Sequence, residues 1–343
     1  MSRPRALILG CAGTELSAEE RAFFRDVDPL GFILFARNVG TVEGTRRLVD
    51  DLRSCVARGE APVLIDQEGG RVARLRPPNW RKAPPARLLG DLYARDPDSG
   101  LEATRLNSRL LAADVASTGC DVDCLPVLDI AFPETHAVIG DRAYADRPEP
   151  VAALGRAAAE GLLAEGVMPV IKHIPGHGRA TVDSHEALPR VTASRAELER
   201  TDFVPFKLLS DLPWAMTGHL LFDAIDPTDC ITVSAGAVQD VIRTHIGFDG
   251  LLLSDDLSMQ ALGGSLGERA ARALAAGCDI ALHCNGRMGE MMEIADRTGA
   301  MTERAHRRFQ GGRSFLARHR DPAGARGLAE AARRVAELLP EWG

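Results

Sequence analysis

The feature of this sequence that most constrains its fold is a series of eight short apolar runs separated by stretches of helical pattern. The runs are continuous rather than alternating, which is typical of parallel strands that are covered on both faces. Eight is also the number of strands that closes a parallel barrel. We therefore expect an α/β fold, a (β/α)8 TIM barrel. The predicted strands are 6–9, 31–35, 62–65, 122–127, 168–171, 215–217, 251–253 and 279–282.

Helix signals lie between the predicted strands, among them a capping box formed by Ser17 and Glu20. The other helix signals begin at Thr41 and Ser194 and cover 100–117, 149–165 and 266–276. Two stretches, 76–99 and 129–150, break the alternation of strands and helices. We predict both as long loops over the active face, where barrel enzymes elaborate their sites.

A chain of 343 residues fits either two average domains or one α/β barrel. No linker divides the sequence, and the pattern after about residue 285 is helical. We therefore expect a single domain over 1–343, with the barrel at about 5–285 and C-terminal helices at about 286–343.

Composition excludes several function classes. The formal net charge of -7 leaves no basic surplus to hold nucleic acid or an anionic membrane. One basic run, 304–313, reads as the solvated face of a helix. No run approaches the roughly 18 apolar residues of a membrane span. Seven cysteines form no CxxC pair, which favours a reducing compartment, so we expect a soluble, cytoplasmic protein. A monomer is our expectation, and the sequence itself leaves the oligomeric state open.

Polar residues follow several of the predicted strands, and in a parallel barrel these strand ends share one mouth. The residues at these ends are Asp66, Glu68, Arg71, Arg74, Asp129, Asp141, Arg142, Lys172, His173, His219, Asp255 and Asp256. A mouth lined by carboxylates and cations suits a polyhydroxylated ligand, which needs charged hydrogen-bond partners.

Two aspartates after the seventh predicted strand allow two interpretations. One can cap a following helix while the other reacts, and Asp255 is the candidate for the reactive carboxylate. Asp183 beside His185 forms a second pair, in which the carboxylate would orient the imidazole as a general acid and base.

A metal site is the alternative for the histidines of 171–185. His173, His177 and His185 could act as ligands. However, a His-x3-His pair binds one metal ion when it lies on a helix, and Pro175-Gly176 prevents a helix here. The Gly-His-Gly-Arg segment is too short to cradle phosphates. We therefore expect no metal and no cofactor.

The motifs resemble those of glycoside hydrolase family 3, in family order over residues 6 to about 285. The resemblance is carried by Lys172-His173-Ile174-Pro175-Gly176-His177-Gly178, Asp183-Ser184-His185, Asp66-Gln67-Glu68-Gly69-Gly70-Arg71-Val72, Gly140-Asp141-Arg142 and Ser254-Asp255-Asp256-Leu257-Ser258-Met259. It is closest to the bacterial β-N-acetylglucosaminidases of cell-wall recycling, which act on small muropeptides.

The resemblance implies a barrel that removes a terminal β-linked N-acetylglucosamine with retention of configuration. It assigns Asp255 as nucleophile, His185 as proton donor and acceptor, and Asp183 as the residue that orients His185. It assigns the sugar-holding positions to Asp66, Arg74, Arg142, Lys172 and His173. His177 then becomes a residue of loop structure. Larger family members use a Glu from a second domain, and the helical end of this sequence favours His185 instead.

Two other functions compete with hydrolysis. A histidine acid/base, unlike a carboxylate, does not repel phosphate, so a phosphorylase is an alternative. A sugar-binding barrel without catalysis is another, although Asp255, Asp183 and His185 are all present. The aglycone, which the family takes as an anhydro-muropeptide, stays open at this point.

Overall fold

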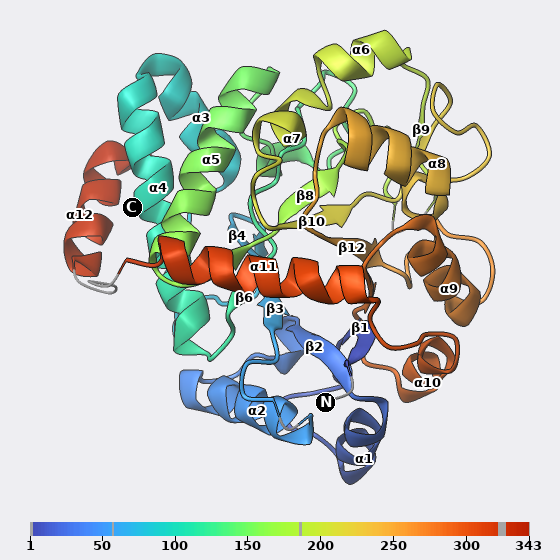
Figure 1. The fold of residues 1–343 in the computed structure, drawn as a ribbon. Coiled ribbons are helices and arrows are strands. Elements are labelled where there is room, and N and C mark those ends of the chain that lie inside the picture. The colour runs from blue at the N-terminus through green and yellow to red at the C-terminus, as the bar shows by residue number, and fades with distance from the viewer. Residues whose placement is uncertain (1–2, 57, 185–186, 322–326, 343) are drawn as a thin grey trace.

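The computed structural model describes residues 3–56, 58–184, 187–321 and 327–342 (Figure 1). Its centre is a parallel sheet in the order β7-β6-β3-β2-β1-β13-β12-β10-β8. The strands of this sheet are β1 (Arg5–Leu9), β2 (Pro29–Leu34), β3 (Val63–Ile65), β6 (Val122–Asp123), β7 (Met168–Pro169), β8 (Ile171–Ile174), β10 (Trp214–Thr217), β12 (Leu251–Asp256) and β13 (Ile280–His283).

The sheet closes on itself because β7 and β8 are two halves of one strand position, separated by Val170. β7 pairs with β6, and a parallel bridge joins Val127 to Lys172 of β8. The Lys172 N–H donates to the carbonyl of Pro126 at 3.1 Å, and the Lys172 carbonyl accepts from Leu128 N–H at 2.7 Å. The structure therefore confirms the expected (β/α)8 barrel.

Each predicted strand coincides with an observed strand position, and three of them differ clearly from the prediction. The run 168–171 is divided into β7 and β8, and β8 continues to Ile174. The run 122–127 forms ladder pairs only over Val122–Asp123, since Pro126 offers no N–H and the chain turns toward β8. The run 251–253 is longer than predicted, because β12 continues to Asp256. Asp255 and Asp256 therefore end a strand instead of following it.

Helices surround the barrel (Figure 1). In the described part of the chain the α-helices are α1 (Ala18–Val27), α2 (Val42–Cys55), α3 (Ala86–Arg95), α4 (Pro97–Ser117), α5 (Pro148–Ala164), α6 (Arg195–Arg200), α7 (Val204–Leu208), α8 (Ala235–Ala237), α9 (Leu266–Ala276), α10 (Met288–Asp296), α11 (Glu303–His319) and α12 (Leu328–Leu338), and the π-helix η4 (Val238–His245) continues α8. The capping box of Ser17 and Glu20 is present, and Thr41 and Ser194 are the N-caps of α2 and α6.

The prediction of a loop over 76–99 is wrong for its second half, which contains α3 and the start of α4. The prolines that suggested a loop precede the first turn of α3 or lie in the first turn of α4, where a missing N–H costs little. Leu89 and Leu92 give α3 a buried face. The stretch 129–150 is largely irregular, with one 3-10 turn, η2 (Gly140–Arg142), before α5.

Helix α11 lies across the amino ends of the barrel strands (Figure 1). Arg308 pairs with Asp279 at 3.0 Å just before β13, and Arg313 pairs with Asp121 at 3.0 Å just before β6. The prediction that 304–313 is a solvated face is therefore wrong for Arg308, whose side chain is only 9% exposed. Cations of this run hold the helix to the barrel instead.

All seven cysteines are buried and unpaired. None of the helices in the described ranges combines the length and the apolar character that a membrane crossing requires.

Candidate active site

A cavity of about 290 Å³ opens at the carboxyl ends of the strands, on the side of the barrel away from α11. Its wall combines charged side chains with an apolar side formed by Ile33, Phe35, Met216, Met259 and Leu282. The charged and polar lining residues are Asp66, Glu68, Arg71, Arg74, Arg142, Lys172, His173, His177, Ser184, Asp255 and Asp256. The structure thus brings together at one mouth the strand-end residues predicted as nucleophile and sugar-holding groups.

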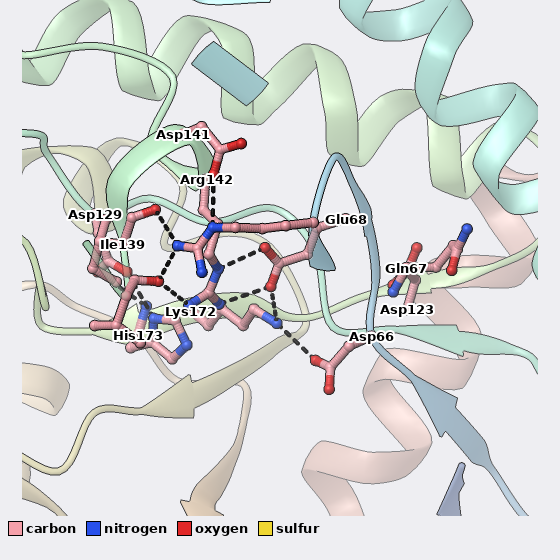
Figure 2. Close-up of polar contacts among 12 residues, drawn as sticks. Asp66, Gln67, Glu68, Asp123, Asp129, Ile139, Asp141, Arg142, Lys172 and His173 are labelled. Atoms are coloured by element: carbon pink, nitrogen blue, oxygen red, sulfur yellow. Dashed lines mark hydrogen bonds and ion pairs between the residues drawn. The ribbon is translucent and has the colours of Figure 1, made fainter. Parts of the chain in front are cut away.

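Lys172 is the centre of the charged wall (Figure 2). Its ammonium lies 2.8 Å from Asp66 Oδ1 and 2.7 Å from Glu68 Oε1, and the side chain is 2% exposed. Arg74 Nη2 donates to the other Asp66 oxygen at 2.9 Å. Burial raises the pKa of the Asp66 carboxyl, but Lys172 and Arg74 outweigh this effect and hold the pKa well below its usual range. Asp66 is therefore an ionised acceptor at the cavity wall.

Glu68 is a central residue of the site, which the sequence placed at a strand end without assigning it a role. Arg142 donates to it through two parallel hydrogen bonds, Nε to Oε2 and Nη2 to Oε1, both at 2.8 Å (Figure 2). Burial would raise the pKa of Glu68, but Arg142 and Lys172 lower it to about 2. Glu68 fixes two of the predicted sugar-holding cations, and its place in the Asp66-to-Arg71 motif was the available signal.

Asp129 organises the histidines of the next strand end. Its Oδ2 lies 2.7 Å from His173 Nδ1, and its Oδ1 accepts the His177 N–H at 2.7 Å. Burial opposes ionisation of Asp129, yet the two imidazoles lower the pKa of its carboxyl to about 2. Burial also lowers the pKa of His177 to about 4, so this imidazole is neutral at pH 7. His177 is both a loop residue and part of the cavity wall.

Asp255 is 8% exposed and lies at the carboxyl end of β12. Its Oδ1 accepts the N–H of Asp256 at 2.8 Å, which orients the carboxylate within the cavity wall. Asp256 accepts hydrogen bonds from the Ser258 N–H and hydroxyl at 3.1 and 2.6 Å. The helix-cap interpretation of this pair is wrong, because Asp256 closes a tight turn and the next helix, α9, begins ten residues later with Ser265 as its N-cap.

His219 holds the turn after β12 from the neighbouring strand end. It is fully buried, with Nε2 3.0 Å from the Asp256 carbonyl and Nδ1 2.8 Å from the Thr232 hydroxyl. Since a carbonyl only accepts, Nε2 carries a proton. Burial lowers the pKa of His219, so the ring is neutral at pH 7 and Nδ1 accepts from the Thr232 hydroxyl. The nucleophile candidate is therefore flanked by a neutral, fixed imidazole.

The segment after β8 is anchored over the cavity by Ser184. Its hydroxyl lies 3.3 Å from His177 Nε2, and its carbonyl accepts the Ala261 N–H at 3.2 Å. Asp183 lies next to this anchor, and its carbonyl accepts the Ala187 N–H at 3.0 Å. His185, predicted as the acid/base partner of Asp183, lies outside the described residues.

Within the described ranges, no group of three or more His, Cys, Asp or Glu side chains is arranged to hold a metal ion. Asp129 instead binds the His173 imidazole and the main-chain N–H of His177.

Comparisons with known proteins agree with the fold. A family model described as the glycosyl hydrolase family 3 N terminal domain matches residues 8–307. The chain is 39% identical over 283 residues to a Beta-hexosaminidase of Alkalilimnicola ehrlichii, covering 81% of this chain and 80% of that relative.

Two solved structures show the same architecture. NagZ from Neisseria gonorrhoeae, in complex with N-trifluoroacetyl-D-glucosamine, has a TM-score of 0.87 at 31% identity and covers 98% of both chains. A glycoside hydrolase family 3 beta-N-acetylglucosaminidase from Paenibacillus sp. str. FPU-7 has a TM-score of 0.84 at 28% identity. The latter match covers 97% of this chain and 67% of that chain.

A parallel barrel with ionised carboxylates and paired cations at its carboxyl mouth suits a polar, hydroxylated ligand. The family model and the relatives show that this chain belongs to glycoside hydrolase family 3. The resemblance seen in the sequence motifs is thereby confirmed. Within the family, the chain groups with the bacterial β-N-acetylglucosaminidases of the NagZ type.

Proposed function

We propose that this protein is a retaining exo-β-N-acetylglucosaminidase that uses Asp255 as nucleophile and His185 as acid/base. The hydrolytic class, β-N-acetylhexosaminidase, follows from family membership and from relatives at 35–39% identity. The observation that carries the residue assignment is the oriented, largely buried Asp255 carboxylate facing a cavity the size of a small sugar.

In the first step, an Asp255 oxygen attacks the anomeric carbon while the bond to the leaving oxygen breaks. His185 donates a proton to that oxygen, and Asp183 orients and charges the imidazole. In the second step, His185 removes a proton from water, which attacks the anomeric carbon and releases Asp255 as a carboxylate. Two inversions at one carbon retain the configuration.

The charged wall supplies the hydrogen bonds that hold the sugar hydroxyls. Asp66 is an ionised acceptor, while Arg74, Arg142, Lys172 and His173 offer donors around it. Because their partners fix these side chains before a ligand arrives, little conformational entropy is lost when the sugar binds.

The aglycone belongs to the same proposal. We infer an N-acetylglucosaminyl-1,6-anhydro-muramic acid, with or without its peptide, as the substrate released in peptidoglycan recycling. A monomeric, cytoplasmic enzyme without a cofactor fits a small substrate of this kind. The relatives with printed β-hexosaminidase names and the size of the cavity support the proposal.

The assignment of the nucleophile is tested with two matched variants, Asp255→Asn and Asp256→Asn, on 4-nitrophenyl N-acetyl-β-glucosaminide. We expect Asp255→Asn to lower kcat by at least about 10⁴-fold, because no covalent intermediate can form. Asp256→Asn keeps an oxygen that accepts from Ser258 and should retain measurable turnover. Equal losses in both variants would contradict the assignment.

The role of His185 is tested by the leaving group. We expect His185→Ala to reduce hydrolysis of a poor leaving group far more than that of 4-nitrophenolate, which needs no proton. His136, whose Nδ1 accepts a backbone N–H in the 129–150 segment, supplies the control variant His136→Ala. An identical loss for both leaving groups in His185→Ala would remove the acid role.

Phosphorolysis is the second candidate, favoured by the absence of a carboxylate from the proposed acid/base position. Product analysis with N-acetylglucosaminyl-anhydromuramyl peptide, with and without inorganic phosphate, separates the two reactions. Free N-acetylglucosamine in both samples supports hydrolysis, whereas a sugar phosphate in one sample supports phosphorolysis. Binding without turnover would leave only a sugar-binding barrel.

A further inference from the structure

His283 is a buried histidine beside the nucleophile turn that the proposed mechanism does not use. It is the last residue of β13, and its side chain is fully buried. It does not belong to the lining of the cavity. Its backbone is fixed by pairing with Leu9 and by the hydrogen bond from the Gly10 N–H to its carbonyl at 2.8 Å.

Two carboxylates face the imidazole from opposite sides. Nδ1 lies 4.0 Å from Asp256 Oδ1 at the end of β12, and Nε2 lies 3.5 Å from Glu290 Oε2 in the first turn of α10. Both ring nitrogens are buried, and among the described residues neither has a hydrogen-bond partner at normal distance. A buried imidazole without partners costs free energy, so this arrangement requires an explanation.

The chemistry of the two partners supplies one. Ionised carboxylates only accept hydrogen bonds, and a neutral imidazole has a single N–H to donate. With one proton, the ring can satisfy at most one carboxylate and turns a lone pair toward the other. With two protons, it can donate to both, and each contact becomes charge-assisted and short. Protonation therefore favours a tighter arrangement of His283, Asp256 and Glu290.

Other groups around His283 set the pH at which this happens. Burial lowers the pKa of His283 and so does Arg37 of the 3-10 turn η1 (Ala36–Asn38), whereas Asp256, Glu290 and Asn285 oppose them. Glu290 is itself held by Asn285 and by Arg287 Nη1 at 3.0 Å. Its side chain is 25% exposed, so the cluster reaches solvent through α10.

Any movement of Asp256 toward the ring acts on the nucleophile turn. Asp256 Oδ1 accepts the N–H groups of Ser258 and Cys284 at 3.1 and 3.2 Å, and the Asp256 N–H orients Asp255. A hydrogen bond from the protonated His283 ring to the Asp256 carboxylate would compete with the hydrogen bonds that shape the turn. The effect on Asp255 is therefore positional and does not require contact with substrate.

We propose that His283 is a proton-sensitive positioning residue: on acidification its imidazole binds Asp256 and Glu290 together and displaces the turn that carries Asp255. The consequence for the reaction rests on the proposed role of Asp255. The structure thus contains a device that lowers kcat below neutral pH while leaving KM nearly unchanged, since His283 does not line the cavity.

The test is the pH dependence of kcat and KM between pH 4.5 and 8.5 for 4-nitrophenyl N-acetyl-β-glucosaminide. His283→Asn, which cannot take up a proton, should keep activity to lower pH, with the acid limb of kcat moved down by about one pH unit. Glu290→Gln removes one opposing carboxylate and should move the same limb down by about one unit. KM should change less than about twofold in both variants.

The matched control is His245→Asn. His245 also lies 3.5 Å from a glutamate, Glu199, but in a helical segment remote from the cavity, and its replacement should leave the limb in place. An acid limb identical in wild type, His283→Asn and Glu290→Gln would overturn the proposal. If His283→Asn does not fold, Glu290→Gln at its partly exposed position decides alone.

Histidine-selective NMR of the full chain separates this inference from the proposed mechanism. The His283 ring should titrate in the wild type, and its pKa should fall by about one unit in Glu290→Gln. This result does not depend on which residue is the nucleophile. Turnover by Asp255→Asn would contradict the mechanism alone, whereas an unchanged His283 titration in Glu290→Gln would overturn the inference alone.

Discussion

Glu68 shows how much a single carboxylate can decide in a charged site. It is 4% exposed at the side chain and neutralises Lys172 while holding both arms of Arg142. Removing one member of such a buried group leaves the other charges without compensation, which costs far more than loss of a surface pair. Glu68 therefore fixes the donors that the proposed function assigns to the sugar.

We predict that Glu68→Gln lowers kcat/KM by roughly 30-fold, about 2 kcal/mol, because Lys172 and Arg142 lose the charge that orients them. The measurement is steady-state kinetics on the 4-nitrophenyl substrate. The control is Glu160→Gln, which removes an exposed ion pair with Arg105 at 2.7 Å and should change kcat/KM less than twofold. Similar kinetics for the two variants would refute the role of Glu68.

The lowered pKa of His177 makes the stability of the folded protein depend on pH. Its pKa is near 4 in the folded protein and near 6.5 in an unfolded chain, so the folded state binds fewer protons between these values. Its contribution to stability is present above about pH 6.5 and is lost as pH falls toward 4, by roughly 3 kcal/mol. We expect His177→Gln to flatten the decrease of Tm over this interval, measured by calorimetry.

The carboxylates of the site act in a lower pH window. Glu68 and Asp129 both have a pKa near 2 in the folded protein, below the usual range of about 4. Their contribution is present above pH 4 and is lost as pH falls toward 2. If the Tm of His177→Gln falls as steeply between pH 6.5 and 4 as the Tm of the wild-type protein, the assignment of this pH dependence to His177 is contradicted.

At the scale of elements, two irregular segments are joined over the mouth of the barrel. The Thr135 hydroxyl donates to the Gly178 carbonyl at 2.5 Å, and the His136 N–H donates to the Ala180 carbonyl at 2.8 Å. A Cβ on Gly178 would lie 1.9 Å from the Ile130 carbonyl oxygen. The close approach of these two backbones therefore requires glycine at position 178.

We predict that Gly178→Ala lowers the free energy of unfolding by about 2 kcal/mol, because the added methyl group pushes the segments 129–150 and 175–180 apart. Thermal unfolding and kcat/KM measure the effect, and both should fall. Gly236→Ala is the control, since nothing lies within 4 Å of its added Cβ in helix α8. Equal Tm values for both variants would argue against the close approach.

The sequence predicts the regular elements far better than the irregular ones. Continuous apolar runs identified every barrel strand position, because strands covered on both faces leave this signature. The sequence did not predict the division of one strand into β7 and β8 or the turn at Asp256, because a bend set by neighbouring strands leaves no local pattern. Helix α3 was not predicted because its flanking prolines are typical of loops, although they lie where a helix can begin.

The site follows the same rule. Residues at strand ends, such as Asp66 and Lys172, could be placed at the mouth from topology alone. The importance of Glu68 and Asp129 depends on which cation or imidazole each one meets, and those partners lie 74 and 44 residues away in the sequence. Only the closed barrel brings each carboxylate to its partner. The sequence motifs could therefore place Glu68 and Asp129 at the mouth but could not show how important each one is.

At the scale of the whole molecule, α11 ties the amino ends of the strands together far from the cavity. We predict that Arg308→Ala lowers the free energy of unfolding by about 2 kcal/mol, because Asp279 loses one of two cations and Asp249 loses its partner. Arg307→Ala, on the exposed face, should cost less than about 0.5 kcal/mol. Calorimetry measures both Tm values, and kcat/KM should not change in either variant.

An effect of Arg308→Ala on kcat/KM comparable to its effect on stability would contradict this separation of the two ends of the barrel. The cavity lies at the carboxyl ends of the strands and α11 lies at the amino ends. Substitutions at α11 should therefore report on assembly of the barrel and not on chemistry.

The pairing of β1 with β13 has a consequence for how the chain is made. Leu7 pairs with Ala281 and Leu9 with His283, so the first strand of the barrel has an open edge until the last strand has been synthesised. On the ribosome this edge stays without its partner while the intervening chain is translated, at about 5–20 residues per second. Unpaired edges invite pairing with other chains. Newly made protein should therefore depend on chaperones more than the finished barrel does.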